Sequence, residues 1–137
     1  MSMMPAQRTG LADAKIFTAG ATVRAGVPIV LQSSDSSYGS QDKPKAIEAA
    51  DATTIPIAIP KGEPGTSYAA GEEFEAWLLV GAAILHVRVG TGGVARADRV
   101  VQSGSGDGIT TMPAFGTATR IHSPGLVLNT GVVGDFV

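Results

Sequence analysis

Residues 73–90 read EFEAWLLVGAAILHVRVG, and this stretch predicts the folding pattern of the chain. Two runs rich in β-branched and aromatic residues flank Gly81-Ala82, and a glycine that opens a two-residue loop favours a type II′ hairpin turn. This turn sets a register in which one side of the hairpin is wholly apolar, so we expect that side to face the core. The facing pairs on the core side are Val80 with Ala83, Leu78 with Leu85, Ala76 with Val87 and Phe74 with Val89.

The opposite side of the predicted hairpin changes from apolar to charged along its length. An ion pair between Glu75 and Arg88 at the open end would stabilise the sheet by about 0.2–1 kcal/mol. The apolar end, near the turn, suggests that Trp77, Leu79 and Ile84 meet another layer or another chain. In this register Leu79 faces Ile84, Trp77 faces His86 and Glu75 faces Arg88.

The composition indicates a single domain whose surface is partly covered by partners. The chain has 137 residues, of which only 16% are charged, against about a quarter in typical globular domains. A surface so poor in charge favours oligomerisation or assembly. The net charge of −2 argues against a nucleic-acid partner, because neutralising phosphates needs clustered Lys and Arg. No run approaches the roughly 20 apolar residues that cross a bilayer, so we expect no membrane partner and a soluble protein made in the cytoplasm.

Glycine and proline are spread along the whole chain and predict an all-β fold, a small β-barrel over residues 19–137. There are 18 glycines and 8 prolines, which separate many short elements by turns. A short apolar strand ends before the polar loop at 33–41. Residues 45–52 suit two turns of helix or a strand, and we favour a strand followed by a turn. Residues 55–60, IPIAIP, predict an edge strand, because two prolines of the same parity remove donors along one edge.

Short repeated patterns predict sharp turns ahead of apolar strands. Residues 24–26, RAG, precede one strand, residues 96–98, RAD, precede another, and residues 70–72, AGE, give a weaker third copy. This texture is typical of a barrel built from similar corners. Asp107-Gly108 is a hairpin signal, and we expect residues 109–111 to form the return strand.

Residues 1–18 have weak periodicity and no predicted strand, so they form either a frayed terminus or an extended arm. An idle tail is usually more polar than this one, and we therefore favour an arm that docks on a partner. The apolar residues behind this interpretation are Met3, Met4, Leu11, Ile16 and Phe17.

The sequence contains no constellation that predicts catalysis, a cofactor or a metal. There is no cysteine, and the two histidines, His86 and His122, have no closely spaced acidic partner. Glu73 and Glu75 lie on one face of a predicted strand, where a solvated face is a better explanation than a glycosidase pair. No G-x-S-x-G elbow is present. We therefore expect a protein that is not an enzyme.

Several segments together resemble the capsid cement, or head decoration, proteins of tailed bacteriophages. The likeness spans roughly residues 15–137 and lies in the order of AGATVRAGVPIVLQ, IPIAIP, YAAGEEFEAWLLVG, GVARADRVVQSGSGDGI and LVLN. The resemblance implies a β-barrel or β-tulip domain with an extended N-terminal arm. It also implies a virion protein on the capsid exterior that binds the major capsid protein, often as a homotrimer near local threefold axes. The family has no catalytic residues to transfer.

In this interpretation the apolar arm and the Trp77, Leu79 and Ile84 patch contact the capsid or a sister subunit, and the protein stabilises the shell by bridging capsomers. A different class of protein remains as an alternative: a small β-barrel binding module, such as a tail or baseplate component. A carbohydrate-binding domain that uses Trp77 and Tyr38 belongs to the same class. Aromatic residues make up only 5% of the chain, which is meagre for sugar stacking.

Overall fold

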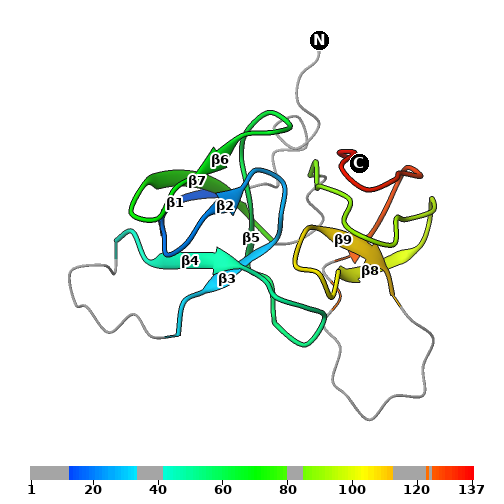
Figure 1. Ribbon diagram of the computed structural model, residues 1–137, viewed down its shortest axis with the longest axis horizontal. Coiled ribbons are helices and arrows are strands. Elements are labelled where there is room, and N and C mark those ends of the chain that lie inside the picture. The colour runs from blue at the N-terminus through cyan, green and yellow to red at the C-terminus, as the bar shows by residue number, and fades with distance from the viewer. Residues whose placement is uncertain (1–12, 34–41, 80–84, 113–122, 124) are drawn as a thin grey trace.

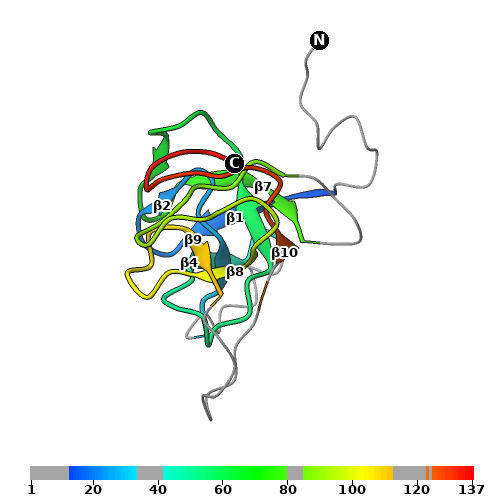
Figure 2. The ribbon, with the colours of Figure 1, turned by 90° about the vertical axis from the view of Figure 1, so that its right-hand side faces the viewer.

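The computed structural model describes residues 13–33, 42–79, 85–112, 123 and 125–137, and this part of the chain is all-β, as predicted, without a helix (Figures 1 and 2). No helix long and apolar enough to span a membrane occurs among these residues. The strands are short and form one closed barrel, a three-stranded sheet and a two-stranded ribbon. They are β1 (Ala14–Ala19), β2 (Val23–Arg24), β3 (Ile29–Leu31), β4 (Lys45–Glu48), β5 (Ala58–Pro60), β6 (Ser67–Tyr68), β7 (Glu73–Leu78), β8 (Arg99–Gln102), β9 (Ile109–Thr111) and β10 (Gly125–Leu126).

The closed barrel has the strand order β1-β4-β3-β5-β7, and β7 closes it by pairing back onto β1. β1 and β4 run parallel, and the other four pairs are antiparallel. Closure leaves both edges of every barrel strand next to another strand, which protects a chain of low charge from edge-to-edge association. The ribbon of β2 and β6 lies beside the barrel (Figure 1).

Stacked aromatic rings fill the barrel interior. Phe17 of β1 lies opposite Phe74 of β7, with ring centroids 6.0 Å apart, and Tyr68 stacks on Phe74 at 5.2 Å. The Tyr68 hydroxyl donates a hydrogen bond to the Lys61 carbonyl (2.6 Å), so this ring keeps a partner for its polar end. Small side chains on the facing strands make room for the rings, and the buried set is completed by Ala19, Val23, Ile29, Ala46, Ala58 and Ala76.

A second unit, formed by residues 85–112, 123 and 125–137, packs around its own apolar cluster. The sheet order is β10-β8-β9, and the cluster contains Val89, Val94, Val100, Ile109 and Val127. The C-terminal segment completes this unit, because Val87 and Val137 exchange two backbone hydrogen bonds (2.9 and 3.0 Å). Figure 1 shows the barrel on the left and this second unit on the right. The barrel therefore spans residues 14–78, and the prediction of one barrel over 19–137 is corrected to a barrel followed by a sheet unit.

Six turns in the described part of the chain share one geometry. In each, a residue with positive φ precedes a hydrogen bond from the fourth turn residue back to the first, as in a type II turn. The φ values are 81° at Gly26, 92° at Gly65, 90° at Gly71, 107° at Gly92, 73° at Ala97 and 93° at Gly134. The bonds close turns 24–27, 63–66, 69–72, 90–93, 95–98 and 132–135. The three predicted corners, 24–27, 69–72 and 95–98, are thus confirmed, and together with turn 132–135 we call them the four corner turns.

The strand after Asp107-Gly108 is confirmed as well, because β9 returns along β8 with Gln102 opposite Ile109. Residues 45–52 form β4 followed by a turn that closes with a bond from Thr54 to Asp51, again as predicted.

The predicted register of the 73–90 hairpin is wrong. β7 has β1 on one edge and β5 on the other, so neither edge is free for residues 85–90. Val87 pairs with Val137 instead, and Val89 donates to the Asp135 carbonyl (2.7 Å). Glu75 pairs with Lys61 and not with Arg88. The physical reason is that closing the barrel satisfies both edges of β7, whereas a local hairpin would satisfy only one. The Gly81-Ala82 turn lies outside the described residues.

The edge strand predicted for IPIAIP is also wrong, because β5 lies between β3 and β7. Lys61 donates to the Glu75 carbonyl (2.9 Å), so Pro60 occupies a position of the ladder that makes no hydrogen bond to β7. Pairing with β3 is recorded only at Ala58. The missing N–H of Pro60 therefore removes no bond from either ladder, and the proline is tolerated inside the sheet.

The predicted arm was too long. β1 begins at Ala14 and is a full strand of the barrel, so residues 14–18 belong to the core fold. Phe17 was expected at an interface, but it is 1% exposed and lies inside the barrel. Only residues 1–12 keep the interpretation as an arm, and they lie outside the described residues.

Candidate interaction surface

The outward face of β1 and β7 brings together three of the residues predicted at an interface. Ala14 lies opposite Trp77 and Ile16 lies opposite Glu75, so these four side chains share the face that points away from Phe17 and Phe74. Leu79 continues this face, because its N–H donates to the Ile57 carbonyl (2.9 Å) and so extends the pairing of β7 with β5. We call Ala14, Ile16, Trp77 and Leu79 the barrel-end surface.

Along β7 this outward face is charged at one end and apolar at the other, but Arg88, predicted at its charged end, is not part of it. Glu73 pairs with Lys43 (3.1 Å) and Glu75 pairs with Lys61 (2.6 Å). The Lys61 ammonium also lies 3.8 Å from the centroid of the Trp77 ring. Such exposed contacts each stabilise by only about 0.2–1 kcal/mol, so their main effect is to orient side chains. Beyond Trp77 the face becomes apolar.

Two further segments leave the barrel at this apolar end. The Leu78 N–H donates to the Asp13 carbonyl (2.7 Å), so the root of residues 1–12 and the root of residues 80–84 are hydrogen-bonded neighbours. Three interface candidates of the arm, Met3, Met4 and Leu11, and one of the 80–84 segment, Ile84, lie outside the described residues. Their points of attachment nevertheless adjoin the barrel-end surface. Ile16 is 42% exposed, and Trp77 and Leu79 are half-buried.

The C-terminal segment carries apolar side chains on its surface that the sequence analysis did not single out. Leu126 and Leu128 are 60% and 57% exposed, on either side of the buried Val127. Val132 and Val133 are exposed in the fourth corner turn. The run Leu126-Val127-Leu128 could have indicated this surface. A strand with one side in water usually alternates apolar and polar residues, whereas all three residues of this run are apolar.

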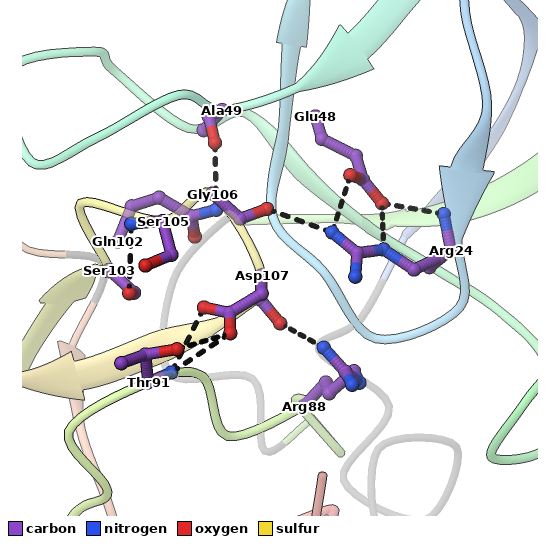
Figure 3. A network of polar contacts seen from close by, with 10 residues as sticks. All are labelled: Arg24, Glu48, Ala49, Arg88, Thr91, Gln102, Ser103, Ser105, Gly106 and Asp107. Atoms are coloured by element: carbon purple, nitrogen blue, oxygen red, sulfur yellow. Dashed lines mark hydrogen bonds and ion pairs between the residues drawn. The ribbon is translucent and has the colours of Figure 1, made fainter. Parts of the chain in front are cut away.

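A polar network joins the barrel to the second unit, and its centre is Arg24 (Figure 3). The Arg24 guanidinium donates to both carboxylate oxygens of Glu48 (2.8 and 2.9 Å) and to the Gly106 carbonyl of the β8–β9 loop (3.1 Å). The hydrogen bond to Glu48 is the main reason that the pKa of Arg24 is raised. The Gln102 amide adds a second link by donating to the Ala49 carbonyl (2.7 Å).

Asp107 fixes the loop that receives Arg24. Its carboxylate accepts hydrogen bonds from the N–H (2.9 and 3.1 Å) and hydroxyl (2.6 Å) of Thr91, and its backbone carbonyl accepts one from Arg88. Partial burial raises the pKa of Asp107, but the hydrogen bonds from Thr91 and Ser103 outweigh it and hold that pKa below its usual value. Apart from the buried Oε1 of Gln102, which has no hydrogen-bond partner among the described residues, the polar groups of these side chains are engaged within the network, so it is structural in character.

The described residues contain no group of three or more His, Asp and Glu side chains that could hold a metal ion. His86 is exposed, while His122 and Tyr38 lie outside the described residues. A scan against protein-family models, a search of curated proteins and a search of solved structures each returned no match for this chain.

Proposed function

We propose that this chain is a structural virion protein that binds the outer surface of a bacteriophage capsid and stabilises the shell by bridging capsomers. The observation that carries the proposal is the convergence at one end of the barrel. The hydrogen bond between Leu78 and Asp13 places the root of the apolar arm, the root of residues 80–84 and the barrel-end surface side by side. One end of the domain thus presents the apolar contacts, and the charged end of the same face remains in water.

The mechanism is the addition of many weak contacts on a repeating shell. Residues 1–12 contain a single charged side chain, Arg8, and several apolar ones. Fully extended, this arm reaches about 40 Å at roughly 3.3 Å per residue, which is long enough to cross a joint between neighbouring subunits. Because each contact repeats over the shell and within an oligomer, avidity supplies the strength that one contact lacks. A homotrimer suits this arrangement, with the major capsid protein as the partner.

The first experiment deletes residues 2–12 and measures co-sedimentation with purified expanded shells. The truncated chain should remain folded, because β1 begins at Ala14, and it should lose shell binding. Deletion of residues 1–18 is not an equivalent test, because it removes Phe17 from the barrel core. Shell binding by the 2–12 deletion at the affinity of the full chain would refute the role of the arm.

A second experiment tests the barrel-end surface with a matched control. Trp77→Ala combined with Leu79→Ser should weaken shell binding, whereas Leu31→Ser should not. Leu31 is 53% exposed and lies opposite Ala46 of β4, which pairs with Ala19 at the other end of β1, so it provides an exposed apolar side chain outside the proposed contact. Equal effects of the two changes would show that general surface polarity, and not this surface, governs binding.

The same proteins distinguish a carbohydrate-binding module from a shell-binding protein. Binding of the full chain to a glycan array, lost on Trp77→Ala and retained without residues 2–12, would favour the module. The contact of the Lys61 ammonium with the Trp77 ring places a cation where a sugar would stack.

A further inference from the structure

β10 is the end strand of the three-stranded sheet, and its outer edge faces away from β8. The Arg99 carbonyl accepts a hydrogen bond from Met112 on the β9 side, so Arg99 directs its backbone groups towards β9. Leu126, which lies opposite Arg99, is therefore at a position of the β8–β10 ladder without mutual hydrogen bonds. The N–H and C=O of Leu126 consequently point outward, away from β8.

The side chains along this edge are apolar and exposed. The Val127 N–H donates a hydrogen bond to the Asp98 carbonyl (3.0 Å), and the Val127 carbonyl accepts one from the Ala97 N–H (2.9 Å). The side chain of Val127 is buried. Leu126 of β10 and Leu128, in the bend that follows the strand, are both exposed. Within the described residues, no hydrogen bond is recorded from the outward backbone groups of Leu126. The outward N–H and C=O of Leu126, flanked by the exposed side chains of Leu126 and Leu128, form a short template for strand addition.

We propose that the outer edge of β10 at Leu126, with the exposed Leu128 that follows the strand, receives the N-terminal arm, residues 1–12, of a neighbouring copy of this chain. This proposal deepens the proposed function and rests on it, because it identifies the sister subunit as the place where the arm docks. Twelve residues precede Asp13, and they carry Met3, Met4 and Leu11 with a single charged side chain. An extended segment of this composition can offer backbone hydrogen bonds and apolar side chains together.

A neighbouring copy is the occupant because the proposed function sets copies side by side on the shell. The arm begins at Asp13, next to the apolar end of the barrel, and at roughly 3.3 Å per residue it spans about 40 Å. The exchange would repeat around an oligomer, since every copy has one arm and one β10 edge, and such a head-to-tail contact closes into a ring when its rotation allows.

The experiment uses engineered disulfides, because the natural chain has no cysteine. One preparation carries Met4→Cys and a second, with a size tag, carries Leu128→Cys. The two are mixed at increasing concentration, oxidised mildly and separated without reductant. The matched control replaces Leu128→Cys by Ile55→Cys, whose parent residue is similarly exposed at 62% against 57%. Circular dichroism of each single-cysteine protein confirms that it is folded.

We expect tagged heterodimers to form several-fold more with Leu128→Cys than with Ile55→Cys, and the excess to vanish when residues 7–11 are replaced by glycine and serine. Equal yields from the two positions would overturn the proposal. If a double variant, Met4→Cys with Leu128→Cys, formed its disulfide within single chains, the arm would dock on its own chain, and the proposal of a neighbouring copy would be wrong. Because no shell is present, failure here leaves the shell-binding result intact, and a failure of shell binding leaves this crosslink intact.

Discussion

The four corner turns allow the effect of a left-handed backbone to be separated from the effect of a close contact. Gly71 and Gly134 have φ values of 90° and 93°, and a Cβ built at either position meets no atom within 4 Å. Gly26 has φ 81°, and a Cβ there would lie 2.7 Å from the Phe136 ring and 3.0 Å from the backbone nitrogen of Arg88. Alanine at the first two positions therefore adds backbone strain alone, whereas Gly26→Ala adds overlap.

The expected magnitudes follow from these two contributions. A left-handed L-residue costs about 1–2 kcal/mol, and about 0.4–1 kcal/mol of this is offset because alanine restricts the unfolded chain. Gly71→Ala and Gly134→Ala should thus lower the free energy of unfolding by about 1 kcal/mol. Overpacking adds about 1–3 kcal/mol at Gly26, where one of the close atoms is backbone and cannot rotate away, giving a total of about 2–4 kcal/mol.

Urea unfolding of the three variants measures these differences, provided that the slope of free energy against urea concentration is unchanged. Ala97→Gly, the reverse change in the one corner without glycine, should raise the free energy of unfolding by a few tenths to about 1 kcal/mol. If Gly26→Ala proved no more destabilising than Gly71→Ala, Phe136 would not press on this corner. The packing of the C-terminal segment against the barrel would then be different from that described.

Three further predictions concern the barrel, the junction and acid stability. Phe17→Ala should lower the free energy of unfolding by about 3–5 kcal/mol, as expected for a buried aromatic residue. Deletion of residues 2–12 should leave the thermal midpoint nearly unchanged. If the two variants had the same thermal midpoint, the assignment of β1 to the barrel would be wrong. A double-mutant cycle with Arg24→Met and Glu48→Gln should give a coupling energy of about 1 kcal/mol in urea unfolding, because the ion pair is bidentate but partly exposed. A coupling energy of zero would contradict the role of this ion pair in the junction. Since the pKa of Asp107 is lowered in the folded chain, its stabilising effect is present above the unfolded value near pH 4 and is lost as the pH falls through the lower folded value. Asp107→Asn should therefore make stability less dependent on pH below about pH 4, and an unchanged acid profile would show that the Thr91 bonds do not depend on the charge.

Turn chemistry is the part of this fold that the sequence predicts best. A left-handed turn residue strongly favours glycine, so the pattern before each apolar strand marks its corner. Asp107-Gly108 likewise indicated the connection between β8 and β9. Ala97 shows that the rule tolerates a small residue, and its turn was found because RAD at 96–98 repeats RAG at 24–26.

Strand partners were harder to predict, because alternation of apolar and polar residues specifies a face and leaves the neighbour open. β7 has the clearest alternation in the chain, yet its partners β1 and β5 come from distant parts of the sequence. β1 itself has a weak alternation of apolar and polar residues. Lys15 has the same parity as the inward-facing Phe17, but it lies at the end of the barrel and is exposed. The sequence therefore presented β1 as part of an arm.

The candidate surface was partly predictable for the same reason. Trp77 and Leu79 have the parity opposite to Phe74, so both faces of β7 are apolar at this end. Because only one face can pack in the core, the other was predicted to be a contact surface. Phe17 could not be assigned in this way, because an apolar residue in a segment without clear periodicity fits the core and an interface equally well. Leu126 was missed because its exposure depends on where the edge of the second sheet lies.

The two apolar surfaces act together only if the barrel and the second unit move as one body. The barrel-end surface belongs to β1 and β7, whereas the β10 edge belongs to the other sheet. The separation between them is fixed by Arg24, which holds Glu48 of β4 and the Gly106 carbonyl at once. A loose joint would let each contact form without transmitting load to the next, and avidity would fall because the second contact would no longer be positioned by the first. In the proposed bridging mechanism, the partly exposed Arg24 contacts and the buried Gln102 bond would hold the two apolar surfaces at a fixed separation.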